Sequence, residues 1–218
     1  RPFMKFAMSY SCGKDSTLAL HKMIEQGHEP MCLIVMVNEA AGRSYFHGAD
    51  PVMLKRYEKA LSLPMISCPA KGETYQAAFE AGLARARSMG AEAVCFGDID
   101  IQQNRQWEED RCKAAGLTPC FPLWQQEREK IVQELLQLGY KCLIKTINRS
   151  ILPMELLGTV LDESAVSVMK AKGIDVCGEN GEYHTLAVDG PVFQEPLLFH
   201  VGGKILLGDY AVSEITAF

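Results

Sequence analysis

The sequence predicts an α/β protein: a doubly wound, five-stranded parallel sheet followed by a smaller α+β domain. Through the first half of the chain, apolar segments of strand length alternate with amphipathic helical segments, which is typical of a parallel sheet covered by helices on both faces. After residue 121 this order ends, and the last part of the chain is rich in glycine and short β-like segments. We therefore expect one domain at residues 1–121 and a second at residues 122–218.

Five segments of the first domain have the composition of buried parallel strands. The run from Met31 to Val37 is apolar without interruption, as expected where helices cover both faces of a sheet. The expected strands are 4–10, 31–37, 64–67, 93–97 and 117–121. Helical patterns lie between them, and glycine follows three of the four. The expected helices are 16–26, 51–61, 74–89 and 106–115.

In the second domain, the pattern predicts a helix at 125–138, a strand at 141–147 and a helix at 162–172, and glycine follows both helices. Short β segments are expected beyond Gly173. In a doubly wound sheet, ligands bind beyond the carboxyl ends of the strands, so the loop after the first strand is the first place to look for chemistry.

Composition and charge exclude several classes of protein. The 218 residues have a formal net charge of −5 and no basic run, so they lack a general attraction for nucleic acid or an anionic membrane. No apolar segment is long enough to span a bilayer. The eight cysteines include no C-x-x-C pair, and several lie in apolar runs, which predicts free thiols in a reducing cytosol. We expect a cytoplasmic enzyme without a structural zinc site, and leave open whether it forms a homo-oligomer.

The segment from Ser11 to Ser16, with the sequence Ser-Cys-Gly-Lys-Asp-Ser, lies between the first expected strand and the first expected helix. Gly13 allows a sharp turn and a close approach of the backbone, and the helix directs its free N–H groups at an anion. Lys14 adds a positive charge. Asp15 and Ser16 stand where they can cap the helix or meet a metal ion carried by phosphates. The segment therefore predicts a phosphate-binding loop.

Two common nucleotide motifs are absent. A Walker A loop needs a glycine at position 8 and a serine or threonine at position 15, where this chain has Met8 and Asp15. No G-x-G-x-x-G follows the strand. The alternative is a turn without a ligand, but the strand–loop–helix context favours phosphate binding.

Two further clusters of polar residues carry candidate chemistry. Residues 97–100, Gly-Asp-Ile-Asp, follow the fourth expected strand, at the same edge of the sheet as the predicted phosphate-binding loop. Asp98 there is a candidate metal ligand, and Arg105 is a candidate for bidentate binding of phosphate or carboxylate. The alternatives are a helix cap and a solvated arginine. Residues 177–185, Cys-Gly-Glu-Asn-Gly-Glu-Tyr-His-Thr, place two carboxylates three positions apart, and the alternative there is a solvated turn.

These segments resemble those of a known superfamily. Residues 11–16 are similar to the PP-loop, S-G-G-x-D-S, of the ATP pyrophosphatases, with Cys12 in place of one glycine. The loop, Gly-Asp-Ile at 97–99, Pro-Leu-Trp at 122–124 and the Glu-rich stretch at 178–185 occur in the order found in the diphthine–ammonia ligase family. Ser44 to His47 also resembles a family loop, and the likeness runs from Met4 to about Val192.

The resemblance implies an adenine nucleotide alpha hydrolase-like fold and an ATP-dependent ligase that needs Mg²⁺. Such an enzyme adenylates a carboxylate with release of PPi, and ammonia or an amine then displaces AMP. The archetype amidates diphthine on elongation factor 2. This chain departs from the eukaryotic and archaeal pattern at Asp98, Asn180 and His184, which resembles the bacterial branch. The resemblance therefore predicts the type of reaction better than the substrate. The substrate is expected to be an unidentified carboxylate, on a small molecule or on a modified protein residue.

The resemblance also implies roles for individual residues. We expect nucleotide binding by Ser9, Tyr10, Ser11, Cys12, Gly13, Lys14, Asp15, Ser16, Val37, Gly97, Asp98 and Arg105. Binding of the second substrate is expected from His47, Glu179, Glu182, Tyr183, His184 and Thr185. The expected catalytic residues are Lys14, Asp15, Glu179, Glu182 and His184, and the expected magnesium ligands are Asp15 and Asp98.

Two other functions compete with this interpretation. Many PP-loop relatives thiolate tRNA, but they need a persulfide-carrying or paired cysteine and a basic RNA surface, which this acidic chain lacks. A non-catalytic ATP-binding sensor of the universal-stress type has a similar sheet. Its glycine-rich loop comes late in the fold, whereas the loop here follows the first strand.

Overall fold

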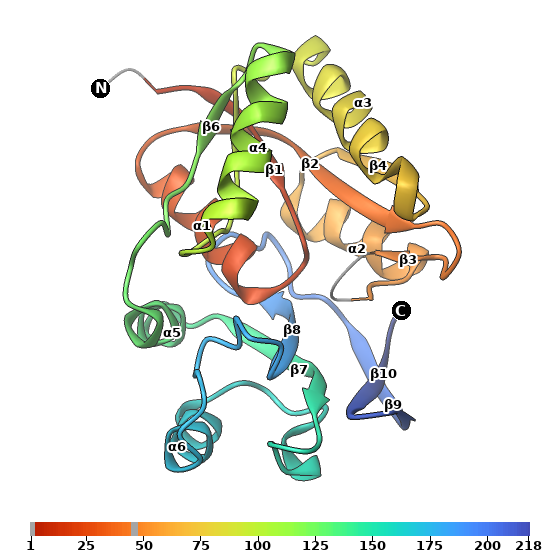
Figure 1. Cartoon of the computed structure of the whole chain (residues 1–218), viewed down its shortest axis with the longest axis vertical. Coiled ribbons are helices and arrows are strands. Elements are labelled where there is room, and N and C mark those ends of the chain that lie inside the picture. Colours follow the sequence, from red (N-terminus) through yellow and green to blue (C-terminus); the bar gives the residue numbers. More distant parts are fainter. Residues whose placement is uncertain (1–2, 45–47) are drawn as a thin grey trace.

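The computed structural model describes residues 3–44 and 48–218 (Figure 1). Up to residue 121 the chain forms β1 (Lys5–Ser9), α1 (Lys14–Glu25), β2 (Glu29–Asn38), β3 (Arg43–Ser44), α2 (Pro51–Leu61), β4 (Met65–Ala70), η1 (Gly72–Thr74), α3 (Tyr75–Ser88), β5 (Ala93–Cys95), α4 (Gln102–Ala115) and β6 (Thr118–Cys120). The rest contains α5 (Arg128–Gln137), β7 (Lys141–Asn148), η2 (Met154–Leu156), α6 (Glu163–Ala171), β8 (Tyr183–Asp189), β9 (Phe199–Leu207) and β10 (Tyr210–Ala217).

The predicted five-stranded parallel sheet is confirmed. Its order is β4-β2-β1-β5-β6, and every neighbouring pair is parallel. After β1, the chain adds β2 and β4 on one side of it, and then adds β5 and β6 on the other side. The switch point therefore lies between β1 and β5, where a doubly wound sheet opens a crevice at its carboxyl edge. The short antiparallel strand β3 pairs with the last two residues of β2 and was not expected.

Helices cover both faces of this sheet. One face packs against α3 and α4 through a cluster that includes Phe79, Leu83, Phe96 and Cys112. The other face packs against α1 and α2, and this cluster continues without a break into the second half of the chain. Because both faces are covered, the central strands β1, β2 and β5 are mostly apolar and buried, whereas β4 and β6, at the two ends of the parallel order, are partly exposed.

The second half forms an antiparallel sheet of order β8-β7-β10-β9, flanked by α5 and α6 below the parallel sheet in Figure 1. The glycine-rich tail forms three strands of seven, nine and eight residues, longer than expected. Strand β9 lies at the edge of the sheet and is exposed along almost all of it, so it lacks the alternation that marks a half-buried strand. The boundary between residues 121 and 122 stays a prediction.

Element boundaries differ from the expected ones where the local pattern is weak. Helix α4 starts at Gln102, four residues early, because its first turns are polar and only Cys112 is fully buried. Helix α5 starts at Arg128 and not at residue 125, since Gln125 adopts a positive φ of 58° that a helix excludes. The eight cysteines form no disulfide, and no helix among the described residues is long and apolar enough to cross a membrane.

Candidate active site

The predicted phosphate loop joins β1 to α1 at the carboxyl edge of the sheet. Cys12 has a φ of 71°, in the left-handed region, while Gly13 has a φ of −88° and is the N-cap residue of α1. The sharp turn is therefore made by Cys12, not by Gly13 as the sequence analysis expected. The Cys12 side chain is fully buried in the core, so the loop presents its backbone and not this thiol to a ligand.

Two serines hold the loop in shape. The hydroxyls of Ser11 and Ser16 lie 2.9 Å apart, and the Ser11 N–H donates to Ser16 Oγ at 3.2 Å. The Gly13 N–H donates to Ser11 Oγ at 3.3 Å. Because the first N–H groups of a helix have no partner within it, those of Asp15 and Ser16 remain available to an anion.

Gly97 brings the end of β5 against the start of α1. A Cβ atom at this position would lie 2.9 Å from the Ser16 nitrogen and 3.1 Å from the Asp15 carbonyl carbon. A side chain there would push the helix start away from the sheet. The glycine is therefore required by close approach of two backbones.

The second half of the chain packs directly on this loop. The Ala187 N–H on β8 donates to the Cys12 carbonyl at 2.8 Å, and the Lys14 N–H donates to Thr185 Oγ1 at 3.0 Å. The Lys14 ammonium is buried, donates to the Cys177 carbonyl at 2.5 Å and pairs with Asp15 Oδ2 at 3.0 Å. Burial disfavours this charge, but the interactions with Asp15 and, to a lesser degree, with Cys177, Tyr183 and Glu179 together outweigh burial and raise the pKa of Lys14. Lys14 thus joins the phosphate loop to the Glu-rich part of the chain that contains Cys177.

The Glu-rich segment, residues 175–185, is held by an arginine that the sequence analysis did not single out. Arg128, at the start of α5, pairs with Asp100 at 2.8 Å and with Asp175 at 2.7 Å. Asp175 in turn accepts from the N–H groups of Cys177 and Glu179, both at 3.0 Å. The network connects the loop after β5 to the backbone that carries Glu179, and it could not be found from local pattern because its members are far apart in sequence.

Asp15, Cys177 and Glu179 form a compact group of candidate metal ligands. Their ligand atoms all lie within 4.8 Å of one another, and the Cys177 thiol donates to Asp15 Oδ1 at 3.7 Å. Burial, and then the charge of Asp15, raise the pKa of Glu179 to about 8. Burial also raises the pKa of the Cys177 thiol well above its usual range, so it stays protonated.

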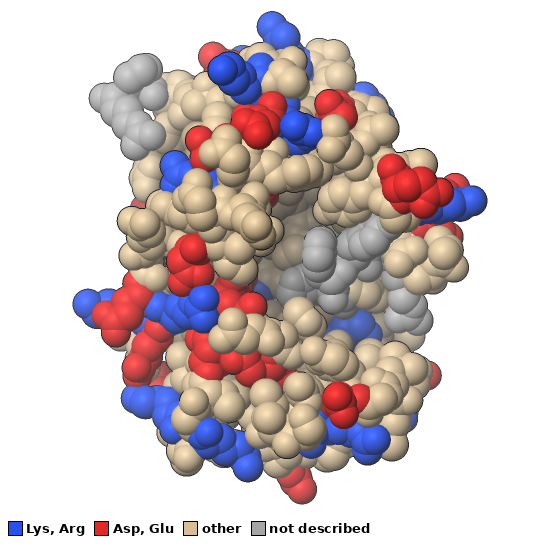
Figure 2. Space-filling model, viewed as in Figure 1, with Lys and Arg blue, Asp and Glu red and all other residues tan. Residues whose placement is uncertain are grey.

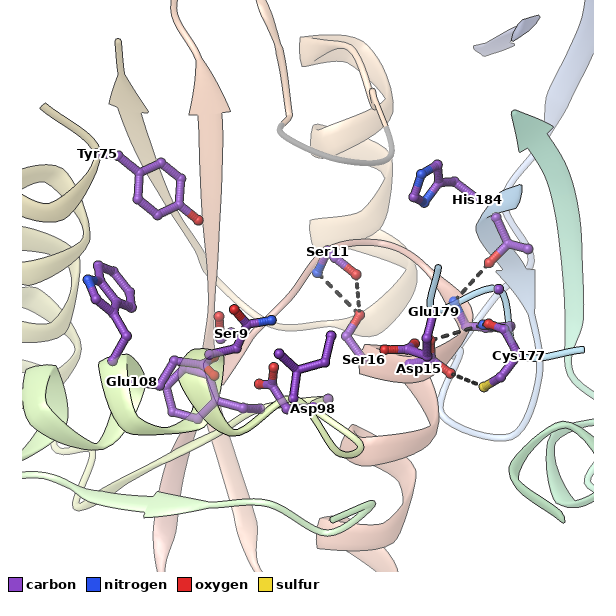
Figure 3. A pocket seen from close by; sticks show the side chains of 18 of the residues that line it. Ser9, Ser11, Asp15, Ser16, Tyr75, Asp98, Glu108, Cys177, Glu179 and His184 are labelled. Atoms are coloured by element: carbon purple, nitrogen blue, oxygen red, sulfur yellow. Dashed lines mark hydrogen bonds and ion pairs between the residues drawn. The ribbon is translucent and has the colours of Figure 1, made fainter. Parts of the chain in front are cut away.

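The loop and the Glu-rich segment line one cavity of about 690 Å³. Figure 2 shows the surface hollowed near the middle of this face, with acidic side chains along one side of the hollow. In Figure 3, Ser11 and Ser16 lie at its centre, with Asp15, Cys177, Glu179 and His184 on one side and Tyr75, Asp98 and Glu108 on the other. The expected site residues that line it are Ser9, Ser11, Lys14, Asp15, Ser16, Gly97, Asp98, Glu179, Tyr183, His184 and Thr185.

Most of the residues on the side of the cavity formed by α3 and α4 were not predicted from the sequence. Asp98 and Glu108 lie carboxyl to carboxyl there, and burial raises the pKa of both, that of Glu108 to about 11. The pair therefore holds a proton at neutral pH. Glu108, Tyr75 and Trp107 lie in helical segments whose exposed, polar pattern gave no sign of a ligand.

Several expected site residues lie elsewhere. Glu182 is buried and accepts from the Asn180 N–H at 2.9 Å, which shapes the turn. Arg105 pairs with Glu109 at 3.0 Å and lies over the rings of Phe121 and Trp124. The others outside the cavity lining are Tyr10, Cys12, Gly13 and Val37. His47 lies outside the described residues.

Tyr183 and His184 begin β8, on the side of the cavity formed by the second half of the chain. Burial, and then the Lys14 ammonium, lower the pKa of His184, which keeps the imidazole neutral near pH 7. The Tyr183 hydroxyl donates to the Val176 carbonyl at 2.5 Å, and its ring lies 5.3 Å from the Lys14 ammonium. The tyrosine therefore packs the motif against the lysine, and the histidine remains as a neutral base at the cavity wall.

The chain is similar in sequence to two protein-family domains and to several enzymes. Residues 4–119 match the diphthamide synthase N-terminal domain, and residues 127–208 match the diphthamide synthase C-terminal domain. The diphthine–ammonia ligase of Rattus norvegicus is 26% identical over 93% of this chain and 85% of its own length. That of Homo sapiens is 25% identical over 89% of this chain and 82% of its own length.

A solved structure described as a predicted subunit of tRNA methyltransferase from Methanocaldococcus jannaschii superposes with a TM-score of 0.46 at 13% identity, covering 89% of this chain and all of that chain. A likeness of this degree says nothing about function. The two domain matches together cover most of the chain, in the order in which its two sheets occur. The chain belongs to the diphthamide synthase family.

Proposed function

We propose that the protein is an ATP-dependent carboxylate–ammonia ligase, which adenylates a substrate carboxylate and then forms an amide with ammonia or an amine. The observation that carries this proposal is the junction at Lys14. Its N–H and its ammonium both bond the second domain, so the phosphate loop and the Glu-rich segment face one cavity. One site can then hold both the nucleotide and the acceptor, which is the condition for transfer between them.

In this proposal the loop binds the phosphates of ATP. The free N–H groups at the start of α1, together with the hydroxyls of Ser11 and Ser16, point at the phosphate position and favour negative charge there. These donors stabilise PPi as it leaves, when the substrate carboxylate attacks the α phosphorus. The products of this step are an acyl-adenylate and PPi.

The residues present fit a divalent cation beside the phosphates. Asp15 and Glu179 offer carboxylate oxygens close together, and oxygen is the donor that Mg²⁺ prefers. When bound, the ion would offset charge on the triphosphate and on PPi. Asp98 faces Glu108 in this structure, so the proposed donors are Asp15 and Glu179.

The amide step needs a proton acceptor. Ammonia attacks the acyl carbon, loses a proton and displaces AMP. His184 lines the cavity as a neutral imidazole, so it can take this proton. The carboxylate substrate stays unidentified: relatives are named for diphthine, and either a modified protein residue or a small molecule would suit the chemistry.

The test is the fate of ATP with a panel of carboxylates and ammonia. Cleavage between the α and β phosphates should give AMP and PPi, in amounts equal to the amide formed. ADP and phosphate as the main products would overturn the proposal. Exchange of labelled PPi into ATP measures the adenylation step alone.

A His184→Ala variant separates the two steps. PPi exchange should stay near the wild-type rate, because His184 acts after PPi leaves, whereas amide formation should slow by about 10²-fold. Glu182→Gln is the matched control, since Glu182 shapes a turn outside the cavity lining and should slow amide formation far less. Equal loss of both steps in the histidine variant would remove His184 from the proposed role.

A further inference from the structure

Arg128 connects two loops that lie on different sides of the candidate site. It is the first residue of α5, and its guanidinium binds two carboxylates at once. Its Nε and Nη2 atoms donate to the two oxygens of Asp100 at 3.0 and 2.8 Å, and its Nη1 atom donates to Asp175 Oδ2 at 2.7 Å. Asp100 lies in the loop after β5, and Asp175 begins the Glu-rich segment. One side chain therefore holds these two loops at a set distance.

The first part of the Glu-rich segment depends on side chains for its shape. Between α6 and β8 the chain forms no helix or strand, and Gly178 and Gly181 have positive φ angles of 71° and 82°. Glycine leaves the backbone many other conformations. The Asp175 carboxylate restricts them, because its Oδ1 atom accepts from the Cys177 N–H and its Oδ2 atom accepts from the Glu179 N–H, both at 3.0 Å.

Asp175 in turn depends on Arg128. The Asp175 side chain is only 10% exposed, and a carboxylate so far from water is costly unless a positive charge meets it. Arg128 supplies this charge to the same oxygen that accepts from the Glu179 N–H. Asp100 binds the guanidinium from the other side as a bidentate pair, which fixes its plane. Without Arg128, the Asp175 carboxylate would turn toward water and release the backbone at Glu179.

The group that this chain of contacts places is the Glu179 carboxylate. Its ligand atom lies within 4.8 Å of those of Asp15 and Cys177, and Figure 3 shows the three side chains together on one side of the cavity. The described residues that line the cavity do not include Arg128 or Asp175. Arg128 therefore acts on the site through other residues.

From these observations we infer that Arg128 is a positioning residue: through Asp175 it holds the backbone of residues 177–179, and so keeps the Glu179 carboxylate beside Asp15, where the two bind a divalent cation. This inference rests on the proposed function, and it adds a residue outside the cavity that sets the affinity for the metal ion. Loss of a group that orients metal ligands typically weakens metal binding by about 10- to 100-fold.

The other interpretation is that Arg128 contributes only an ion pair to stability. Its side chain is 29% exposed, and exposed ion pairs add little to the free energy of unfolding. The two interpretations predict opposite signs for metal binding. Loss of a nearby positive charge would by itself strengthen the binding of a cation, whereas loss of the Glu179 position would weaken it.

The probe is Mn²⁺ alone, because electron paramagnetic resonance of the free ion gives its affinity without turnover. The wild type should bind Mn²⁺ in a saturable way, and Glu179→Gln should abolish this binding. Arg128→Gln should weaken it by about tenfold or more. Arg128→Lys should weaken it as well, since an ammonium keeps the charge but lacks the planar fork that binds two carboxylates. Unchanged or tighter binding in the Arg128 variants would overturn the inference.

Lys22→Gln is the matched control. Lys22 pairs with Glu134 on α5 at 2.9 Å, so this variant also removes a cation that joins α5 to the first half of the chain, but one outside the described cavity lining. It should leave the Mn²⁺ affinity unchanged. Equal weakening in Lys22→Gln and Arg128→Gln would show a general effect of α5 packing and would contradict the assigned role. Circular dichroism verifies folding, and Arg128→Lys serves for the comparison if Arg128→Gln does not fold.

Exchange of labelled PPi into ATP provides a second readout. In Arg128→Gln, a high Mg²⁺ concentration should restore exchange to near the wild-type rate, because both metal ligands are still present and only their placement is lost. Glu179→Gln should stay slow at every Mg²⁺ concentration. Slow exchange in Arg128→Gln that Mg²⁺ does not restore would overturn the inference.

The failure of this inference can be told apart from that of the proposed function. If Arg128→Gln weakens Mn²⁺ binding but no AMP forms with any carboxylate, the ligase proposal fails and the positioning role stands. If AMP and PPi form but Arg128→Gln binds Mn²⁺ as the wild type does, only the positioning role fails. Absence of Mn²⁺ binding in the wild type would overturn the pair of metal ligands and the role of Arg128 with it.

Discussion

Cys12 differs from the PP-loop pattern in residue type but keeps the backbone conformation of the loop. The PP-loop pattern has glycine at this position, and the structure gives Cys12 the left-handed backbone that glycine adopts without cost. For a residue with a side chain, this conformation costs about 1–2 kcal/mol. The buried thiol and the hydrogen bond from the Ala187 N–H to the Cys12 carbonyl help to offset it.

Glu108 gives a prediction about stability and pH. Its pKa is about 11 in the folded protein and near its ordinary value when unfolded, so the folded state keeps a proton that the unfolded state releases. The free energy of unfolding should therefore fall as the pH rises through this interval. Glu108→Gln cannot ionise, so its melting temperature should exceed that of the wild type by a margin that grows from about pH 5 to about pH 9.

Thermal unfolding across this pH range provides the measurement, with Glu109→Gln as the control. Glu109 pairs with the partly exposed Arg105, so its variant should differ from the wild type by a nearly constant amount. Parallel curves for Glu108→Gln and the wild type would show that Glu108 ionises normally, and the carboxyl pair would then not hold a proton.

At the scale of elements, the site depends on the contact between the end of β5 and the start of α1. The N-terminus of α1 supplies the free N–H groups, and Gly97 lets β5 approach them closely. The position of Gly97 on the same edge as the loop could be predicted, because the carboxyl ends of parallel strands meet there. The backbone contact could not, since it depends on how the helix packs on the sheet.

Gly97→Ala should therefore weaken ATP binding by about tenfold or more, because the added methyl displaces the first turn of α1 from the phosphate position. Gly203→Ala is the matched control: a Cβ there meets no atom within 4 Å, and its φ is not in the left-handed region. Calorimetric titration with ATP gives the affinities, and circular dichroism verifies that both variants fold. Unchanged affinity in Gly97→Ala would show that the helix start does not hold the phosphates.

At the scale of the whole molecule, the two sheets share one core. A continuous cluster of buried side chains runs from β1, α1 and α2 into α5, α6, β7 and β8. Tyr57, on α2, donates to the Ala187 carbonyl on β8 at 2.6 Å. The residues expected to form two domains are thus joined by apolar packing as well as by the hydrogen bonds at Lys14.

Because of this shared core, residues 1–121 and 122–218 should unfold together. Differential scanning calorimetry should show one transition, with equal calorimetric and van't Hoff enthalpies. Thr185→Val, which leaves the buried Lys14 N–H without its acceptor, should lower the melting temperature without splitting the transition. Two separate transitions in the wild type would mean that the two parts unfold independently.

The amino-acid sequence was enough to establish the α/β class, the alternation of strands and helices, the position of the loop between β1 and α1, and the family. These features follow from periodicity, glycine placement and short motifs, all of which act over a few residues. Tertiary structure alone decided the rest: that Lys14 turns toward Cys177, that Arg128 holds Asp175, and that Glu182 shapes a turn while Glu108 faces the cavity. Lys14 and Cys177 stand 163 residues apart, and only the docking of the two sheets brings them together, so no local pattern could foretell their contact.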